Sequence, residues 1–399
     1  MNSTGEPYVE VAGFQVPSRL IDGYQVHRAA LSRDFDVLSL PRQVLLAGTS
    51  GAVPAEVSFA HGVPEASGLS AVTFAQDRRL ARALLERAAV PKSAGASFSW
   101  RSISRARRYA NKLGYPVVLR EGVGENPVRA IHHINSGEEL RAAFAELRRR
   151  DKADRTPGSN PHIAGYATTR LTFTHDEEGN EVAPLRSRMM VEEDVPGSTI
   201  RAFVVGGELV AAVELDETQA TGVKDRTNDL PTELTQVLVR AAEAIPGLAC
   251  ATVDAIHRRD ADSTQVQDFV VIGISERPRI ETYLTASTDL DDVLGDALLG
   301  FQALEAGLSL GPVVDTIARP LEIEGLRHAD KVADELPQVA KAHGITLEVH
   351  RADSVAGDID AWASGAPAAI AALVELLMAG YLVDDKAAAV NFSKEAPSD

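Results

Sequence analysis

The sequence predicts a mixed α/β (α+β) protein with more than one domain, and three observations support this prediction. The chain has 399 residues, which is enough for two or three domains with real cores. Stretches with helical apolar spacing alternate with short apolar runs bounded by Gly and Pro, which is typical of interleaved helices and strands. Residues 317–392 follow the order strand, helix, strand, strand, helix, strand. We therefore expect three domains, over residues 1–72, 73–308 and 315–393.

The elements expected in the first part of the chain follow from apolar patterning. Three short apolar runs among Gly and Pro predict a small N-terminal α/β lobe: Tyr8–Val11, Val37–Leu40 and Val44–Leu46. Apolar residues at helical spacing predict one helix over Thr73–Ala89, which Pro91 ends. A basic helix is expected over Ser102–Leu113.

The middle of the chain predicts further helices and antiparallel strands. Ser136 followed by Glu139 forms a capping box that opens a helix over Ser136–Arg149. Strands are expected at Leu171–Thr174 and Met189–Val191. The doublet Gly206-Gly207 predicts a hairpin between Ile200–Val205 and Leu209–Val213. The remaining elements expected before the C-terminal region are the helix Leu234–Ile245, the strands Cys250–Ile256 and Phe269–Ile274, and the helix Leu290–Ala306.

Composition excludes some partners. The formal net charge of −17 argues against a nucleic acid or an anionic membrane as partner, because phosphate-rich surfaces need a basic face. The chain shows no run of 18 apolar residues and no N-terminal basic-plus-apolar signal. Cys250 is the single cysteine, which rules out an intrachain disulfide and fits a reducing compartment. We therefore expect a cytoplasmic protein.

The run GYPVVLREGVG at residues 114–124 is the strongest chemical signal. An apolar strand, Val117–Leu119, delivers the basic side chain of Arg120 into a loop that contains Gly122 and Gly124. Backbone N–H groups and a fixed positive charge then meet at one place, which suits a polyphosphate. The pattern therefore predicts a nucleotide site.

Five segments along the chain share one order with a known family: DRRLAR (77–82), GYPVVLREGVG (114–124), VEEDVPGSTIRAFVVGGELVAA (191–212), IPGLACATVDAI (245–256) and VVIGISERPRI (270–280). In this order they resemble the ATP-grasp superfamily, most of all its amino-acid ligases such as the ATP-grasp part of cyanophycin synthetase and γ-glutamyl ligases. The resemblance implies a two-lobed ATP-grasp fold over residues 73–308, with ATP and Mg²⁺ as cofactors.

The resemblance also implies roles for individual residues. Nucleotide contacts fall on Arg82, Arg120, Gly122, Gly124, Glu192, Val195 and Thr199. Charge stabilisation during transfer falls on Arg201, Lys224 and Arg277. Magnesium ligands fall on Asp254 and Ser275. The family's second metal motif, Glu-x-Asn, is altered here to Gly273-Ile274-Ser275, which offers no carboxylate, so a second ion would need Glu276 or Asp268.

Plainer interpretations apply to three residues of these segments. Arg82 is either a phosphate contact or a solvated helix charge. Arg78 is expected to be a surface charge. Asp254 is either a metal ligand or a partner in a structural salt bridge, because an unpaired carboxylate in an apolar strand is costly.

The C-terminal region resembles the acylphosphatase-like βαββαβ fold. Only Gly325-Leu326-Arg327 corresponds to the phosphate loop of that family, so we expect packing or dimerisation there and no phosphatase activity. For the whole chain the resemblances imply an ATP-dependent ligase that joins a carboxylate, such as glutamate, to an amine through an acyl phosphate. Its partners would be small molecules, with a homodimer possible. The alternative is a degenerate ATP-grasp protein that binds nucleotide or peptide without turnover.

Overall fold

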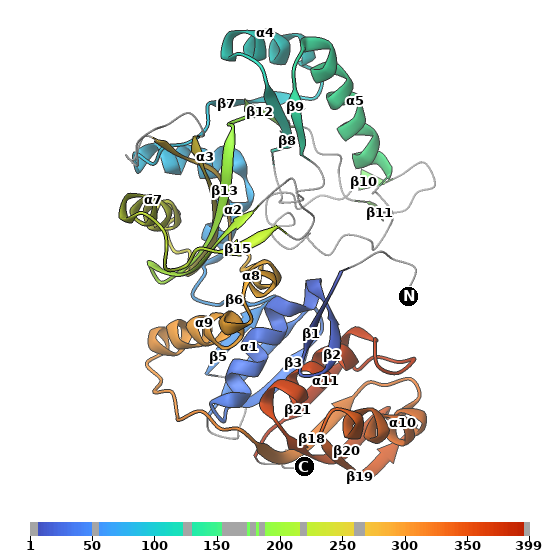
Figure 1. Cartoon of the computed structure of the whole chain (residues 1–399). Helices are drawn as coiled ribbons and strands as arrows, with labels where there is room; N and C mark the ends of the chain where they lie inside the picture. The colour runs from blue at the N-terminus through green and yellow to red at the C-terminus, as the bar shows by residue number, and fades with distance from the viewer. Residues whose placement is uncertain are drawn as a thin grey trace. The chain divides into compact units, whose positions relative to one another are not determined.

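The computed structural model describes residues 7–49, 56–122, 130–153, 174–175, 181–182, 188–215, 222–258 and 268–394. The chain divides into two compact units, and each is described by itself (Figure 1). The first unit comprises Met1–Ala66, Val223–Asp225 and Arg277–Asp399, and the second comprises Ser67–Gly222 and Arg226–Glu276. The mixed α/β class is confirmed. The three expected domains stay a prediction.

An eight-stranded antiparallel sheet forms the centre of the first unit. Its strand order is β19-β20-β18-β21-β3-β4-β5-β6. The strands are β3 (Asp36–Leu40), β4 (Val44–Gly48), β5 (Val57–Ala60), β6 (Val63–Pro64), β18 (Ile317–Glu324), β19 (Thr346–Asp353), β20 (Asp358–Gly365) and β21 (Ala389–Phe392). The first and last parts of the chain therefore share one sheet, because β21 pairs with β3.

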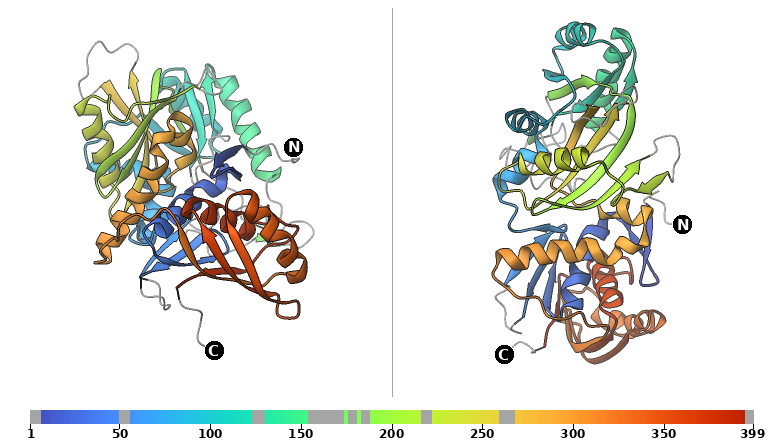
Figure 2. Two further views of the ribbon diagram at one scale, coloured as in Figure 1. Left: turned by 60° about the horizontal axis from the view of Figure 1, so that its bottom comes forward. Right: turned by 60° about the vertical axis from the view of Figure 1, so that its left-hand side comes forward.

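Helices cover one face of this sheet. The helices of the unit are α1 (Ile21–Ser32), α8 (Ile280–Ala286), α9 (Asp291–Glu305), α10 (Ala329–Ala342) and α11 (Pro367–Ala379). Of these, α1, α10 and α11 pack on the strands (Figures 1 and 2). A hairpin of β1 (Tyr8–Val11) and β2 (Phe14–Pro17), short 3₁₀ turns at Ser18–Leu20 and Thr288–Leu290, and β15 (Val223–Asp225) complete the unit.

The C-terminal elements confirm the expected βαββαβ order. Within the sheet they lie as β21-β18-β20-β19, which is the order of a ferredoxin-like arrangement. Strand β18 alternates buried and more exposed residues, as a sheet with one covered face requires. Gly380 ends α11 in the left-handed conformation that glycine adopts without strain. The likeness to acylphosphatase itself stays a prediction.

Two larger antiparallel sheets are described in the second unit. The smaller sheet has the order β7-β12-β8-β9, with β7 (Gly95–Ser99), β8 (Val117–Glu121), β9 (Ile131–Ile134) and β12 (Arg188–Glu193). Helices α4 (Ile103–Leu113) and α5 (Gly137–Ala153) cover one of its faces (Figure 2). Apolar residues of these helices and strands form one core, which includes Ala106, Phe144, Leu119 and Val191.

The larger sheet contains β14, β13, β16 and β17 in that order. These strands are β13 (Gly197–Val205), β14 (Glu208–Leu215), β16 (Cys250–Arg258) and β17 (Phe269–Ser275). Its apolar face packs against α2 (Leu69–Gln76), α3 (Arg78–Arg87) and α7 (Thr232–Glu243). A two-stranded ribbon, β10 (Thr174–His175) with β11 (Glu181–Val182), is also formed.

One expected helix was wrong. The stretch expected as a single helix over Thr73–Ala89 is two helices, because the chain is extended at Asp77. The buried carboxylate of Asp77 accepts a hydrogen bond from the backbone N–H of Arg79 and caps α3. Residues 171–173 of another expected strand lie outside the described residues. Among the described helices, none combines the length and the apolar character that a membrane span requires.

Candidate functional site

Strand alternation separates an apolar face from a charged face on the smaller sheet of the second unit. Leu119 and Val191 lie opposite each other on neighbouring strands and pack in the core beneath α4 and α5. Arg120 and Glu192, one residue further along each strand, therefore lie on the opposite face. The predicted phosphate cation and the predicted hinge carboxylate thus belong to the same surface.

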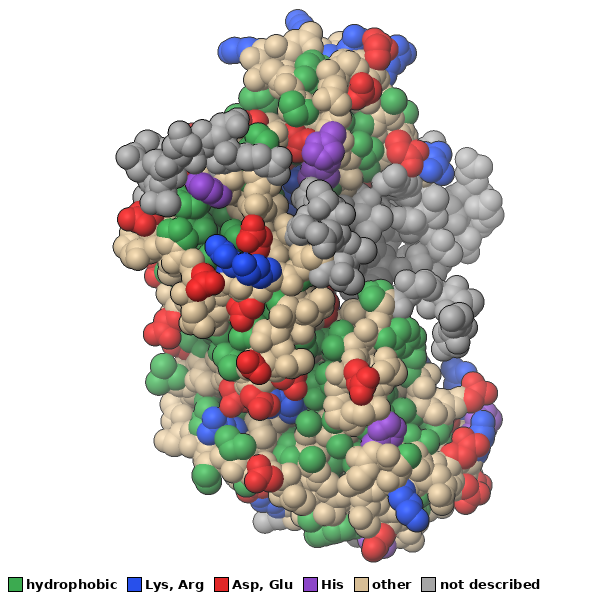
Figure 3. Space-filling view, viewed as in Figure 1, with side chains coloured by type: hydrophobic (Ala, Val, Ile, Leu, Met, Phe, Trp, Pro, Cys, Tyr) green, Lys and Arg blue, Asp and Glu red, His purple; other side chains and the backbone are tan. Residues whose placement is uncertain are grey.

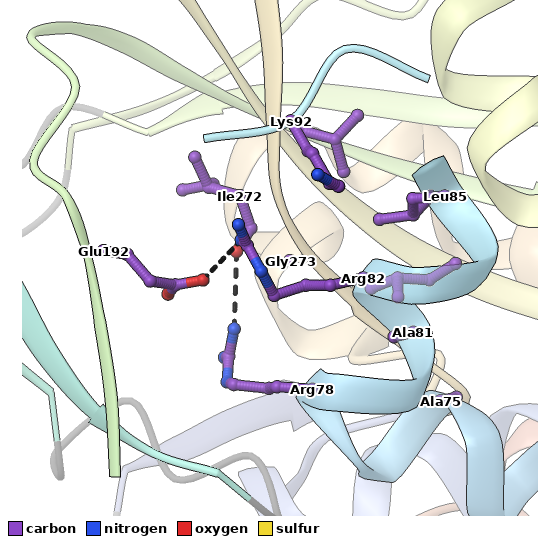
Figure 4. A pocket seen from close by; sticks show the side chains of 11 residues that line it. Ala75, Arg78, Ala81, Arg82, Leu85, Lys92, Glu192, Ile272 and Gly273 are labelled. Carbon is purple, nitrogen blue, oxygen red and sulfur yellow. Dashed lines mark hydrogen bonds and ion pairs between the residues drawn. The ribbon is translucent and has the colours of Figure 1, made fainter. Parts of the chain in front are cut away.

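Helix α3 brings two more guanidinium groups to this surface. Arg82 Nη1 donates to Glu192 Oε1 at 2.6 Å and to Ser93 Oγ at 3.3 Å. Arg78, one helical turn earlier, donates from Nη1 to the backbone oxygen of Ile272 at 3.4 Å (Figure 4). Arg120 Nε lies 3.8 Å from Glu192 Oε2. We refer to Arg78, Arg82 and Arg120 as the arginine cluster.

The arginine cluster carries more positive charge than its partner neutralises. Glu192 is buried, with 3% of its side chain exposed, and Arg82 and Arg120 are 14% and 17% exposed. Burial lowers the pKa of Arg120 and the charge of Arg78 lowers it further, while the carboxylates of Glu192, Asp254 and Asp194 oppose that shift. Arginine nevertheless stays protonated in proteins. The cluster is therefore suited to an anion.

Arg120 has an unused donor at this place. Its Nε is buried and has no hydrogen-bond partner among the residues that the structure describes. Buried donors are nearly always paired, so one without a partner in a cationic cluster is where an anionic oxygen would fit. Arg120 is therefore the member of the cluster best placed to bind a phosphate oxygen.

Gly95 provides space for the ion pair. It lies opposite Glu192 in the sheet, and a Cβ added to it would meet Glu192 Cγ at 2.8 Å and Arg82 Nη2 at 3.2 Å. A side chain here would therefore displace both charged groups. Beside them lies a hollow of about 20 Å³, lined among others by Arg78, Arg82 and Gly273 (Figure 4). This is room for about one water molecule, so the hollow itself admits no more than a single ligand atom or water.

On the larger sheet the structure pairs two other predicted site residues. Arg201 on β13 lies directly opposite Asp254 on β16. Arg201 Nε donates to Asp254 Oδ1 at 2.8 Å and Arg201 Nη2 donates to Oδ2 at 3.0 Å. This bidentate geometry is the strong form of an arginine–carboxylate pair. Asp254 is therefore a salt-bridge partner of Arg201, and its predicted role as a magnesium ligand stays a prediction.

The surroundings of Asp254 do not fit Mg²⁺ well. On its other side the register places Gly273, which has no side-chain oxygen, and Ser275 is buried. Mg²⁺ prefers hard oxygen ligands and usually takes one or two carboxylates. Within the described ranges, no three His, Cys, Asp or Glu side chains are grouped to hold a metal ion. Glu276 accepts a hydrogen bond from Gln76 Nε2 at 2.6 Å.

The remaining predicted nucleotide contacts are placed as follows. The Gly122 N–H donates to the oxygen of Arg188, and its carbonyl accepts from the N–H of Arg78, so both backbone groups serve the fold. Val195 is buried in a small apolar cluster with Ile256 and Val270. Thr199 is buried on β13. Gly124 lies outside the described residues.

Two predicted catalytic cations belong to the first unit. Lys224 is exposed on β15. Arg277 lies 3.7 Å from the carboxylate of Asp22 through its Nη2. Within the second unit, then, the described structure assembles Arg82, Arg120, Arg201, Glu192 and Asp254, while the roles predicted for Lys224 and Arg277 stay predictions.

Sequence reasoning missed Arg78. The expectation of a surface charge is wrong, because its side chain is half-buried and lines the hollow beside Arg82. A signal was present, since Arg78 and Arg82 are four residues apart and residues at that spacing lie on one helix face. The solvated alternative for Arg82 is likewise wrong, because Glu192 and Ser93 bind it.

Comparison with known proteins gives structural likeness at low identity. No protein-family profile and no curated protein sequence matches the chain. Among solved structures, the chain is similar to the ATP-grasp ligase PsnB complexed with the precursor peptide PsnA2 and AMPPNP, with 14% identity and a TM-score of 0.39 over 59% of this chain and 61% of that one. It is also similar to the VanG D-Ala:D-Ser ligase from Enterococcus faecalis, with 14% identity and a TM-score of 0.38 over 58% and 63%. The chain thus spans less than two thirds of either structure.

Proposed function

We propose that the second unit binds the triphosphate of ATP at the arginine cluster. The observation that carries this proposal is a pair of guanidinium groups, Arg82 and Arg120, on one buried carboxylate, with a third, Arg78, lining the hollow beside them. A buried Arg120 donor is left unused in the part of the chain that the structure describes. Guanidinium groups hold phosphate oxygens through paired hydrogen bonds, which a single point charge does not do. The charge excess and the open donor both favour an anion with several oxygens.

The resemblance of the sequence to ATP-grasp ligases supplies the reaction that we propose. A carboxylate would take the γ-phosphoryl group of ATP and release ADP. An amine would then displace phosphate from the acyl phosphate and form an amide. Holding a carboxylate beside a triphosphate brings like charges together, so fixed cations would offset their repulsion and orient them. The second unit offers Arg120 and Arg82 for the nucleotide and Arg201 for the developing charge. The substrates would be an amino acid such as glutamate and an amine.

Release of phosphate from ATP tests this proposal. The full chain is assayed with ATP and a panel of amino-acid pairs, with and without Mg²⁺. Arg120→Ala is expected to lower kcat/KM by about 100-fold, the typical cost of losing a group that stabilises transition-state charge. Arg105→Ala removes an exposed guanidinium from α4, where basic side chains gather on the surface (Figure 3), and serves as the matched control that keeps activity. Equal activity in all three proteins would contradict the assigned site.

A second candidate function is nucleotide binding without turnover, in a regulatory or assembly role. The bidentate Arg201–Asp254 pair favours it, because that pair neutralises the carboxylate on which the metal-assisted reaction would depend. ATP uptake measured by calorimetry, without phosphate release for any amino-acid pair, is the expected result for this candidate. Turnover that depends on an amino acid would exclude it.

A further inference from the structure

The carboxylate of Asp254 is already occupied by a cation. Arg201 contacts both of its oxygens, and the pair is largely screened from solvent, with side chains 14% and 21% exposed. A divalent cation approaching Asp254 would meet the positive charge of Arg201 at hydrogen-bond distance from the same oxygens. Coulomb repulsion between them is weakly screened in a partly buried site. Asp254 is therefore a poor anchor for a metal.

On the neighbouring strand β17, the residue in register with Asp254 is a glycine, which has no side-chain ligand. Gly273 lies in register with Asp254, and a Cβ added to it would stand 3.7 Å from Asp254 Oδ2. A carboxylate at position 273 would thus lie beside Asp254, whereas glycine leaves that place without a ligand. A metal site built on one carboxylate, itself paired with arginine, lacks the hard oxygen ligands that Mg²⁺ prefers.

Cations surround the same region. Arg120 interacts electrostatically with Arg78, Glu192, Asp254 and Asp194. Gly273 lines the hollow next to Arg78 and Arg82. Four guanidinium groups of the second unit, on Arg78, Arg82, Arg120 and Arg201, therefore accompany three described carboxylates, those of Glu192, Asp254 and Asp194. We propose that this site binds ATP in its metal-free form, with guanidinium groups neutralising the triphosphate in place of a protein-bound Mg²⁺ ion. The inference rests on the proposed function and concerns the ionic form of its nucleotide.

The test compares the Kd of the full chain for ATP in excess EDTA with the Kd in excess Mg²⁺, by calorimetry. Removal of the metal leaves the triphosphate more negative, so binding in EDTA is expected to be as tight as in Mg²⁺ or tighter. Binding at least ten-fold tighter with Mg²⁺ would overturn this inference and leave the proposed function standing. An absence of binding under both conditions would overturn both, so the two failures are distinguishable.

A variant that gains a metal ligand provides a second test of the same inference. Gly273→Glu places a second carboxylate beside Asp254, and the backbone of Gly273 lies outside the left-handed region, so a side chain is tolerated. Gly273→Gln, of the same size and without the charge, is the matched control. With Mn²⁺ alone as the probe, followed by electron paramagnetic resonance, Gly273→Glu is expected to bind at least ten-fold tighter than the wild type. Equal Mn²⁺ affinity in the wild type and the Glu variant would refute the inference.

Discussion

Arg82, Glu192 and Arg120 show how a buried charge acquires its partners. Glu192 loses its water on burial and gains a hydrogen bond from Arg82 together with the nearby charge of Arg120. Isolated buried charges are costly, so the buried carboxylate of Glu192 is compensated by the two cations beside it and orders both. This ordering, more than the number of charges, makes the surface a candidate binding site, because the donors are held before any ligand arrives.

Asp194, two residues after Glu192, gives a pH-dependent prediction. Burial opposes its ionisation, but a hydrogen bond from His132, the backbone N–H of His133 and the charges of both histidines together lower its pKa below the usual 3.8. A carboxylate with a lowered pKa stabilises the fold above its unfolded pKa, and that contribution is lost as the pH falls through the folded pKa. The wild type should therefore lose stability relative to Asp194→Asn as the pH falls from about 5 through and below the usual carboxyl pKa of 3.8.

Urea unfolding of both proteins across this pH range measures the difference. Asp353→Asn is the control for general acid effects, because Asp353 also has a lowered pKa but lies in the first unit and is bound by the backbone N–H groups of Ala356 and Val355. A difference in the free energy of unfolding between the wild type and Asp194→Asn that stays constant with pH would contradict the lowered pKa of Asp194.

At the scale of elements, the break between α2 and α3 decides where the arginine cluster points. Apolar spacing continues through Thr73–Ala89, and the sequence pattern therefore predicts a single helix. Asp77 interrupts it, because its carboxylate binds the N–H of Arg79 in place of solvent and starts a new helix. Arg78 and Arg82 then lie on the first turns of α3. A continuous helix would place them at different angles to the sheet.

Removal of this cap should weaken both the helix and the site. Asp77→Ala is expected to lower the free energy of unfolding by about 1 kcal/mol, the usual cost of losing an N-cap side chain. Asp77→Asn retains an acceptor and should cost less than half as much. Thermal unfolding measures the stability, and calorimetry with ATP measures the site. We expect the affinity for ATP to fall in the Ala variant and to be kept in the Asn variant. Equal affinity in both variants would show that the cap does not influence the site.

Helix α1 shows why some elements escape sequence patterning. Every residue of Ile21–Ser32 is buried, including His27 and Arg28. Helical periodicity is visible only when one face is polar and solvated, so a helix covered on all sides gives no such signal. The polar members of α1 are compensated by contacts distant in sequence, such as Arg28 Nη1 with Asp292 Oδ1 at 2.6 Å. Those contacts exist only after folding.

At the scale of the molecule, the sheet shared by the N- and C-terminal parts of the chain is the main organising feature of the first unit. Arg319, almost fully buried near the start of β18, lies over the ring of Phe392 and donates to Asp36 Oδ1 at 2.9 Å. It also pairs with Asp34. The Arg319 side chain therefore links the start of β18 to the N-terminal strands across β21.

Loss of the Arg319 side chain should destabilise both the N-terminal and the C-terminal strands of this sheet. Arg319→Ala leaves a buried carboxylate without its partner and is expected to destabilise the first unit by roughly 3 kcal/mol. Arg351→Ala removes an exposed pair with Asp360 on the same sheet and should cost less than about 1 kcal/mol. Amide hydrogen exchange is the measurement, with faster exchange expected in α1 as well as β18. Acceleration restricted to β18 would show that the two parts open separately.

The sequence by itself determined the local elements and their chemical types. Alternating apolar residues, glycine turns and capping pairs act between neighbours in the chain, so the hairpin of β13 and β14, the helix after Ser136 and the βαββαβ order were predictable from them. Arg120 at the end of an apolar strand was predictable for the same reason.

Only the tertiary structure decided which charges meet. Arg201 with Asp254, and Arg82 with Glu192, are 53 and 110 residues apart, and their pairing depends on strand register and helix placement. A local sequence pattern predicts neither ion pair. The residue type determines what a side chain can bind, and the fold determines which groups lie close enough to be bound. That difference places Arg201 against Asp254, whose role as a magnesium ligand stays a prediction.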